Sequence, residues 1–283
     1  MLNISKISFP GLGIGEFEID SVAFSIAGFE IAWYAIIITI GMIFAVSHLL
    51  FRASQVGLNA DTVFDYVLIT IPLGIIGARL YFVFAKIENF DSLWEVINIR
   101  DGGLAIYGGI LVGALSVFII SKVKKISFLA FADCCTPGIL LAQAIGRWGN
   151  FTNGEAFGGP TDIFCRMGLN GMYVHPTFLY ESLWNLLGFI IANIFHKKRQ
   201  YDGQVFFFIF GWYGFGRMFI EGLRTDSLYA SLFGIEFRVS QVLAGAIFLA
   251  CATALIYFAI RKPERKMFFY DNPKMKNKTK TEE

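Results

Sequence analysis

The stretch IAWYAIIITIGMIFAVSHLL, residues 31–50, contains no Asp, Glu, Lys or Arg. A helix needs about 20 apolar residues to cross a bilayer, whereas a barrel strand shows about ten alternating ones. Because this stretch is continuously apolar, it predicts a membrane-spanning helix, whose backbone polar groups bond to one another. Further apolar runs follow it, and together they predict seven spans: residues 31–50, 63–85, 106–121, 128–146, 177–195, 203–221 and 239–260.

The composition of the whole chain agrees with this interpretation. Of its 283 residues, 55% are hydrophobic and only 16% are charged, whereas about 25% of residues are charged in soluble domains. A soluble domain of this size cannot bury so much apolar surface, so the excess is expected to face lipid. These values exclude a soluble enzyme, a disordered chain and a nucleic-acid-binding protein.

The Lys and Arg residues outside the spans predict the orientation. When successive loops are assigned alternately to two sides, most of the 24 Lys and Arg fall on one side, with residues 122–125, residues 197–199 and the tail from Arg261. Cytoplasmic loops are enriched in these residues. The sequence therefore predicts an all-α polytopic membrane protein with seven transmembrane helices, its N-terminus outside and its C-terminus cytoplasmic.

Three regions follow from these spans. Residues 1–28 lack the basic leader of a removable signal peptide, and we expect them to form an extended segment at the outer interface. Residues 29–260 are the seven-helix membrane domain, and residues 261–283 are a basic cytoplasmic tail. Loops 86–105 and 148–176 both lie on the outer side and are long enough to form a small extracytoplasmic cap.

Ionisable residues within membrane helices are costly, so they indicate function. One face of the sixth predicted helix carries four polar residues within an arc of roughly 80°: Tyr213, Arg217, Glu221 and Arg224. The fourth helix repeats the pattern with Gln143, Arg147 and Asn150 if it continues beyond its predicted end, and Arg79 lies at the same outer level. Several guanidinium groups beside apolar walls suit the phosphate of a phospholipid. The alternative is that Arg217 and Glu221 only pair with each other.

The segment GRWGNFTNGEAFGGP, residues 146–160, holds five glycines among bulky aromatic residues. Such a composition predicts a tight loop whose backbone closely approaches another group. Asn150 and Asn153 supply amide donors, and Glu155 supplies a carboxylate. In the fifth predicted span, Glu181 and Asn185 lie one turn apart, and we expect them to form interhelical hydrogen bonds.

This segment resembles the signature of the prolipoprotein diacylglyceryl transferases, Gly-Arg-x-Gly-Asn-Phe-x-Asn-x-Glu-x-x-Gly, at every fixed position from Gly146 to Gly158. Further pieces typical of that family follow the same order along residues 30–260: Trp33-Tyr34, Gly77-Ala78-Arg79-Leu80-Tyr81, Gly102-Gly103, Gly108-Gly109, His175-Pro176-Thr177, Leu179-Tyr180-Glu181 and the residues from Tyr213 to Arg224. The chain departs from the family at Tyr107, where the family commonly has a His that is discussed as a catalytic base. Tyr is a poor base at neutral pH, with a reference pKa near 10.

The resemblance implies transfer of the diacylglyceryl group of phosphatidylglycerol to the lipobox cysteine of a prolipoprotein signal peptide, with release of glycerol-1-phosphate. It implies a multi-pass protein of the bacterial cytoplasmic membrane, in contact with membrane lipids, whose active site faces the extracytoplasmic leaflet. No cofactor, no metal and no nucleic acid is expected.

On this hypothesis, the catalytic candidates are Arg147, Glu155, Arg217 and Tyr107. The candidates for binding the headgroup are Arg147, Asn150, Asn153, Gly158, Tyr34, Tyr213, Arg224, Glu221, Arg79 and His175. Glu155 is the preferred candidate for activating the thiol, with Tyr107, His175 and Glu221 as alternatives. A competing interpretation of equal weight is that Glu155 only holds Arg147 in place. The alternative function is a secondary transporter of an anionic or lipid-like substrate, but such proteins place ionisable groups near the midplane and often contain inverted repeats.

Overall fold

The computed structural model describes residues 4–90, 92–99, 102–196, 198–232 and 235–261. These residues fall into two compact units, the first within residues 1–48 and 135–266 and the second within residues 49–134. Helices α1 (Trp33–Gln55) and α5 (Phe128–Thr152) contribute to both units. We describe each unit by itself.

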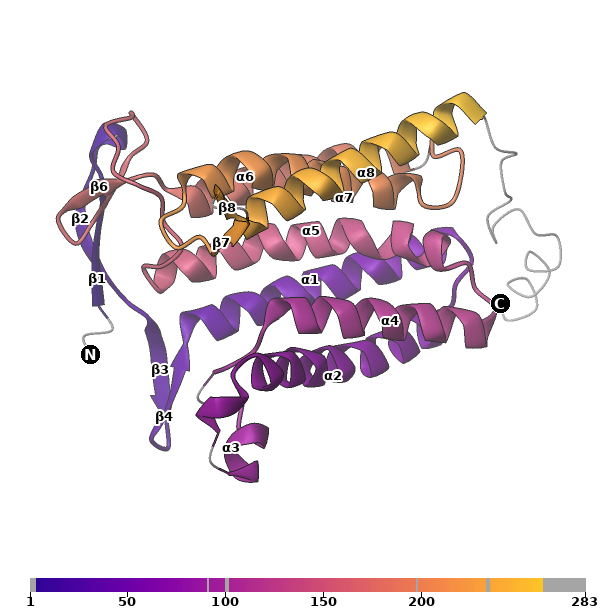
Figure 1. Ribbon diagram of the computed structural model, residues 1–283, viewed down its shortest axis with the longest axis horizontal. Helices are drawn as coiled ribbons and strands as arrows, with labels where there is room; N and C mark the ends of the chain where they lie inside the picture. Colours follow the sequence, from indigo (N-terminus) through magenta and orange to yellow (C-terminus); the bar gives the residue numbers. More distant parts are fainter. Residues whose placement is uncertain (1–3, 91, 100–101, 197, 233–234, 262–283) are drawn as a thin grey trace. The chain divides into compact units, whose positions relative to one another are not determined.

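Each predicted span is found as a helix (Figure 1): α1, α2 (Ala60–Ala85), α4 (Ile106–Lys124), α5, α6 (Thr177–His196), α7 (Gln204–Ile220) and α8 (Val239–Arg261). Within the described part of the chain, six of these are long and apolar enough to cross a membrane. The exception is α7, which has 17 residues and stands at the lower limit of about 17–25 for a spanning helix. The chain is therefore a polytopic, mainly helical membrane protein with six candidate spans.

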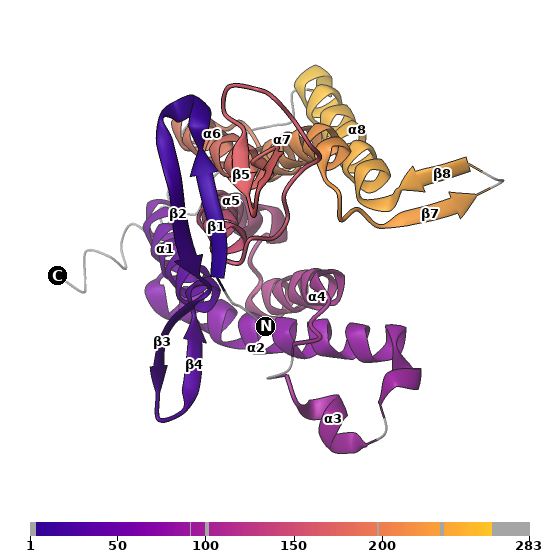
Figure 2. The same ribbon diagram turned by 90° about the vertical axis from the view of Figure 1, so that its left-hand side faces the viewer.

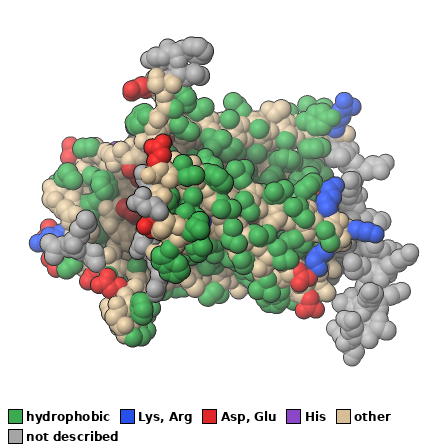
Figure 3. All heavy atoms as spheres, turned by 60° about the horizontal axis from the view of Figure 1, so that its bottom comes forward, with side chains coloured by type: hydrophobic (Ala, Val, Ile, Leu, Met, Phe, Trp, Pro, Cys, Tyr) green, Lys and Arg blue, Asp and Glu red, His purple; other side chains and the backbone are tan. Residues whose placement is uncertain are grey.

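Hydrophobic side chains on the helix surfaces are exposed in a way that suits lipid. Leu68, Ile43 and Leu249 are 70%, 60% and 64% exposed, and soluble monomers rarely expose large contiguous apolar patches. In the space-filling view, hydrophobic side chains cover most of the visible face, and the charged side chains lie towards its ends (Figure 3).

Outside the helices, the first unit also contains small sheets, which the sequence did not predict. A four-stranded antiparallel sheet has the order β2-β1-β5-β6, and Figure 2 shows two further hairpins, β3–β4 and β7–β8. The strands are β1 (Ile4–Phe9), β2 (Ile14–Asp20), β3 (Val22–Ile26), β4 (Phe29–Ala32), β5 (Met167–Leu169), β6 (Met172–Val174), β7 (Tyr229–Leu232) and β8 (Ile235–Arg238). The predicted extended conformation near the N-terminus is confirmed from Ile4 onward, but its pairing with a distant loop was not predicted.

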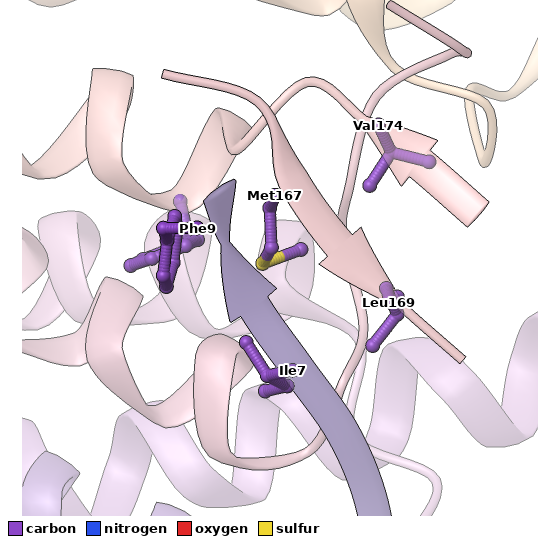
Figure 4. Packing of buried hydrophobic residues seen from close by; sticks show 6 residues of the cluster. Ile7, Phe9, Met167, Leu169 and Val174 are labelled. Carbon is purple, nitrogen blue, oxygen red and sulfur yellow. The ribbon is translucent and has the colours of Figure 1, made fainter. Parts of the chain in front are cut away.

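An apolar cluster holds this sheet to the start of α6 (Figure 4). Ile7 and Phe9 of β1 pack with Met167 and Leu169 of β5, and each is at most 8% exposed. Val174 and Phe178 complete the cluster. Burying a side chain of this size contributes about 1.5–3 kcal/mol, so the cluster stably joins the N-terminal strands to the segment that leads into α6.

Helix α5 continues to Thr152, whereas the sequence predicted its end at residue 146. The backbone N–H of Asn153 and the hydroxyl of Thr152 both donate to the carbonyl of Gly149, at 3.1 and 2.8 Å. The ring of Phe151 also stacks on that of Phe178, with centroids 4.6 Å apart. These bonds and contacts extend the helix, and the tight loop predicted for residues 146–160 begins only after Thr152.

The second unit is built on the close approach of α2 and α4. A Cβ on Gly108 would lie 2.3 Å from the carbonyl oxygen of Gly77, so only glycine permits this contact. Loop 86–105, predicted to share a cap with loop 148–176, belongs to this unit and contains α3 (Leu93–Ile97).

Candidate active site

A buried carboxylate in the first unit is shared by three arginines. Glu181, near the start of α6, is 2% exposed. Its Oε2 lies 2.6 Å from Nη2 of Arg147, and its Oε1 lies 2.6 Å from Nη1 of Arg217 and 3.4 Å from Nη1 of Arg224. The end of α5, the last turn of α7 and the segment after α7 therefore converge on one side chain. We call these four residues together with Glu221 the arginine cluster.

Glu221, 1% exposed, is the second buried carboxylate of this cluster. Its Oε2 lies 2.5 Å from Nη2 of Arg217 and 3.9 Å from Nε of Arg224. The pairing of Arg217 with Glu221 considered from helical spacing is thus confirmed, but it is one part of a larger network. Arg238 adds a hydrogen bond from its Nη1 to the backbone carbonyl of Glu221.

Arg224 makes a further contact outside the buried core of the cluster. Its Nε and Nη2 donate to the two carboxylate oxygens of Asp226, at 2.9 and 2.7 Å. Burial alone would raise the pKa of Asp226, but the hydrogen bonds and the charge of Arg224 lower that pKa below its ordinary value. The pair therefore persists at neutral pH and is lost as the pH falls through the lowered pKa of Asp226. Sequence reasoning missed Asp226, which follows Arg224 by two residues.

The signature residues at the end of α5 form a connected chain of hydrogen bonds. Arg147 donates from Nη1 to Oδ1 of Asn150 at 3.3 Å, and Asn150 donates from Nδ2 to Oε1 of Glu155 at 2.9 Å. Asn153 donates to the same carboxylate oxygen at 3.3 Å. Asn150 therefore links Glu155 to Arg147 by two hydrogen bonds. Tyr34 lies against this helix end, since a Cβ on Gly149 would lie 2.7 Å from its ring.

Gly158 lies where three segments meet. Its N–H donates to the carbonyl of His175 at 2.9 Å, and Gly158 also pairs with Arg224 in an isolated antiparallel bridge. A Cβ on Gly158 would lie 2.6 Å from the Cβ of His175 and 2.9 Å from the carbonyl oxygen of Leu223. These contacts of Gly158 fix the loop of residues 153–160, the signature loop, to the segment that carries Arg224.

His175 and Tyr213 occupy other surroundings in the first unit. Nδ1 of His175 lies 3.3 Å from the hydroxyl of Tyr180, which in turn lies 3.8 Å from the sulfur of Cys165. Tyr213 packs against the apolar cluster that includes Leu140 of α5.

Arg79 and Tyr107 belong to the second unit and are described within it. The guanidinium of Arg79 donates to four backbone carbonyls at 2.6–2.9 Å, those of Glu95, Val96, Gly102 and Gly103. It thus holds loop 86–105 in place, a role that sequence reasoning did not assign to it. Tyr107 is partly buried in the first turn of α4.

The interhelical contacts expected from α6 are present. Asn185 donates from Nδ2 to Oε1 of Gln143 at 3.4 Å, and Glu181 joins three segments by charge. The sequence did not predict that three arginines share Glu181. The signal was nevertheless available, because Glu181 is an acidic residue in an apolar span at the level of Arg147 and Arg217.

Comparison with known proteins identifies the family of this chain. The sequence model of the family described as prolipoprotein diacylglyceryl transferase matches residues 21–257. A protein of Enterococcus faecalis named phosphatidylglycerol–prolipoprotein diacylglyceryl transferase is 43% identical over 279 residues, covering 93% of this chain and 98% of that protein. A relative with this name, numbered 1, from Clostridium perfringens is 44% identical over 263 residues, covering 88% of this chain and 99% of its own length. The chain therefore belongs to the prolipoprotein diacylglyceryl transferase family.

Proposed function

We propose that this protein transfers the diacylglyceryl group of phosphatidylglycerol to the lipobox cysteine of prolipoproteins, forming a thioether and releasing glycerol-1-phosphate. This is the first step of bacterial lipoprotein maturation. Family membership and the names of the relatives support the proposal. The structural observation that carries it is the buried carboxylate Glu181, which the signature residue Arg147 shares with Arg217 and Arg224.

The reaction is a displacement at a glyceryl carbon. The thiolate sulfur forms a bond to that carbon, and the bond from the carbon to the phosphate oxygen breaks, so its electron pair stays on the phosphate. The thiol proton passes to a base, because the thiolate is the nucleophile. The charge on the phosphate group therefore grows from about −1 towards −2. Cations placed where negative charge develops lower the barrier.

The arginine cluster supplies these cations. Arg147 and Arg217 bind the departing phosphate in this proposal, and Arg224 supports them. Their side chains are only 11–20% exposed, so water screens their charges less than it would at the surface. The two buried carboxylates, Glu181 and Glu221, help to hold the three guanidinium groups in position before substrate arrives, as preorganised electrostatic catalysis requires.

The remaining headgroup contacts come from the signature loop and its neighbours. Asn150 and Asn153 orient the glycerol headgroup, and Tyr34 borders the same helix end. Gly158 allows the loop to approach closely, with His175 beside it. Tyr213, which packs against the apolar cluster that includes Leu140, also lines the headgroup site in this proposal.

Glu155 is the preferred base. Its side chain is exposed, and only amide groups are described as donating to its Oε1, so it is accessible to an incoming thiol. Glu221 is less suitable because it is 1% exposed and its Oε2 already contacts Arg217 and Arg224. Tyr107 and His175 remain alternatives. Comparing Glu155→Gln with Tyr107→Phe across pH distinguishes the candidates, since loss of the base removes the ionisation that limits the rate at low pH.

The proposed topology has seven transmembrane helices, with α7 as the additional span. Residues 1–28 are assigned to the outer interface and residues 29–260 to the membrane domain. Residues 261–283, which lie outside the described residues after Arg261, are assigned to the cytoplasmic side. The N-terminus is extracytoplasmic in this topology, because most Lys and Arg fall in the loops assigned to the opposite side. Membership of the family supports residence in the bacterial cytoplasmic membrane. In this topology the ends of α5 and α7 face outward, which supports an active site towards the extracytoplasmic leaflet, where phosphatidylglycerol and signal peptides arrive laterally.

The test is a transfer assay with purified protein in phospholipid. Phosphatidylglycerol labelled in its diacylglycerol part is incubated with a lipobox peptide and, as the matched control, with the same peptide carrying Cys→Ser. We expect label on the cysteine peptide alone. Absence of transfer, or equal transfer to both peptides, would overturn the proposed function.

A further inference from the structure

The pairing of Arg224 with Asp226 has the geometry that an arginine uses for phosphate. Two nitrogens of Arg224, Nε and Nη2, donate in parallel to two oxygens of one carboxylate, at 2.9 and 2.7 Å. Arginine binds phosphate groups with the same two-pronged arrangement. Asp226 thus covers the side of Arg224 that a phosphate in this site would bind.

Of the three carboxylates that hold the arginines, Asp226 is the one able to leave. The side chains of Glu181 and Glu221 are 3% and 2% exposed, whereas that of Asp226 is 51% exposed. Separating a buried ion pair leaves an uncompensated charge and is strongly unfavourable. A half-exposed carboxylate can instead rotate into water, which solvates it. An incoming anion therefore replaces Asp226 more readily than either glutamate.

The charge balance of the three arginines and their three carboxylates supports the same conclusion. Three arginines face three carboxylates while Asp226 is bound, so their charges balance; once Asp226 rotates away, one positive charge is uncovered. This charge matches the single negative charge of a phosphodiester lipid. After transfer, the product is a phosphate monoester with a charge of about −1.5 to −2 at neutral pH, so the arginines attract the product more strongly than the substrate.

From these observations we infer that Asp226 competes with the phosphate for Arg224 and, by returning to it, drives glycerol-1-phosphate out of the site. The inference rests on the proposed function. Asp226 is then a positioning residue that acts through Arg224, and it limits the affinity for the product so that turnover can continue.

Asp226→Asn tests this role, because it removes the charge and retains the shape. We expect the inhibition constant of glycerol-1-phosphate in the transfer assay to fall about tenfold. The product then no longer has to displace a charge-assisted contact, and such a contact is worth about a factor of ten in affinity. The KM for phosphatidylglycerol and kcat should both fall, since binding tightens and product release slows. Asp226→Glu keeps the charge, and its inhibition constant should remain near that of the wild type.

Asp162→Asn is the matched control. It removes an equal charge from an exposed residue of loop 148–176, which is not among the described partners of the three arginines, and should leave the inhibition constant unchanged. Asp226→Ser provides a second charge-free variant if the Asn variant is unstable. An inhibition constant that is unchanged or higher in both charge-free variants, with a melting temperature equal to that of the wild type, would overturn the inference.

Direct binding of glycerol-1-phosphate by calorimetry separates this inference from the proposed function, because it requires no turnover. If the wild type transfers label but Asp226→Asn binds the product no more tightly, only the role of Asp226 fails. If the wild type transfers no label and neither protein binds glycerol-1-phosphate, both proposals fail. Tighter binding by Asp226→Asn without any transfer supports the competition and contradicts the proposed reaction alone.

Discussion

Glu181 decides where three guanidinium groups lie. Arginine side chains are long and flexible, and three positive charges repel one another at short range. The buried carboxylate of Glu181, with contacts of 2.6, 2.6 and 3.4 Å, is the one that all three share, so it offsets part of this repulsion and fixes their directions. The residue therefore acts by positioning the groups that we assign to the phosphate.

Replacing Glu181 with Gln should destabilise the protein and slow transfer. The change leaves the buried arginines with one fewer compensating charge, and breaking such a pair costs about 3–5 kcal/mol. We expect a lower melting temperature in detergent and a transfer rate at least tenfold lower. Glu16→Gln is the control, because Glu16 is 59% exposed and contacts Lys6 only at 3.6 Å, a surface pair worth about 0–1 kcal/mol. Equal stability and activity of the two variants would contradict the positioning role.

At the scale of elements, the site depends on contacts between segments distant in sequence. The loop after α5, the segment before α6 and the turn after α7 meet at Gly158. The long apolar runs predict the helices because each helix makes its own backbone hydrogen bonds. They do not predict the pairing of β1 with β5, which joins Ile7 to Leu169 and depends on the fold as a whole.

Gly158→Ala should disturb this crossing, whereas Gly159→Ala should not. A Cβ at Gly158 meets the Cβ of His175 and a backbone carbonyl at less than 3 Å, and neither can move easily. A Cβ at Gly159 meets no described atom within 4 Å. We expect about 1–3 kcal/mol of destabilisation for the first variant and lower transfer activity, measured by thermal unfolding and the transfer assay. Similar effects of the two substitutions would contradict the tight crossing.

At the scale of the whole molecule, composition and charge distribution predicted a polytopic helical membrane protein. The positions of Arg147 and Arg217 on helix faces predicted much of the candidate site. Helical spacing gives the face of one helix and not its partner, so it predicted neither the sharing of Glu181 by three arginines nor the contact of Asp226 with Arg224, although the acidic Glu181 in an apolar span was a visible signal. Arg79 likewise was predictable as an intramembrane charge, but not as the residue that holds its neighbouring loop.

Membrane topology is tested by labelling single cysteines on the two sides of α7. Lys198→Cys precedes this helix and Leu228→Cys follows it, and both positions are exposed. In a Cys165→Ser background, an impermeant maleimide added to intact cells should label position 228 and reach position 198 only after permeabilisation. Labelling of both positions in intact cells would show that α7 does not span the membrane.

The central claim is that the arginine cluster stabilises the charge that develops on the departing phosphate. Arg147→Ala tests it most directly, because Arg147 joins the signature loop to Glu181. The measurement is the single-turnover rate of transfer at saturating phosphatidylglycerol, which excludes effects on substrate binding and product release. Removing one such donor typically costs about 10²–10³ in rate, so we predict at least a hundredfold decrease. A rate equal to that of the wild type would contradict the account.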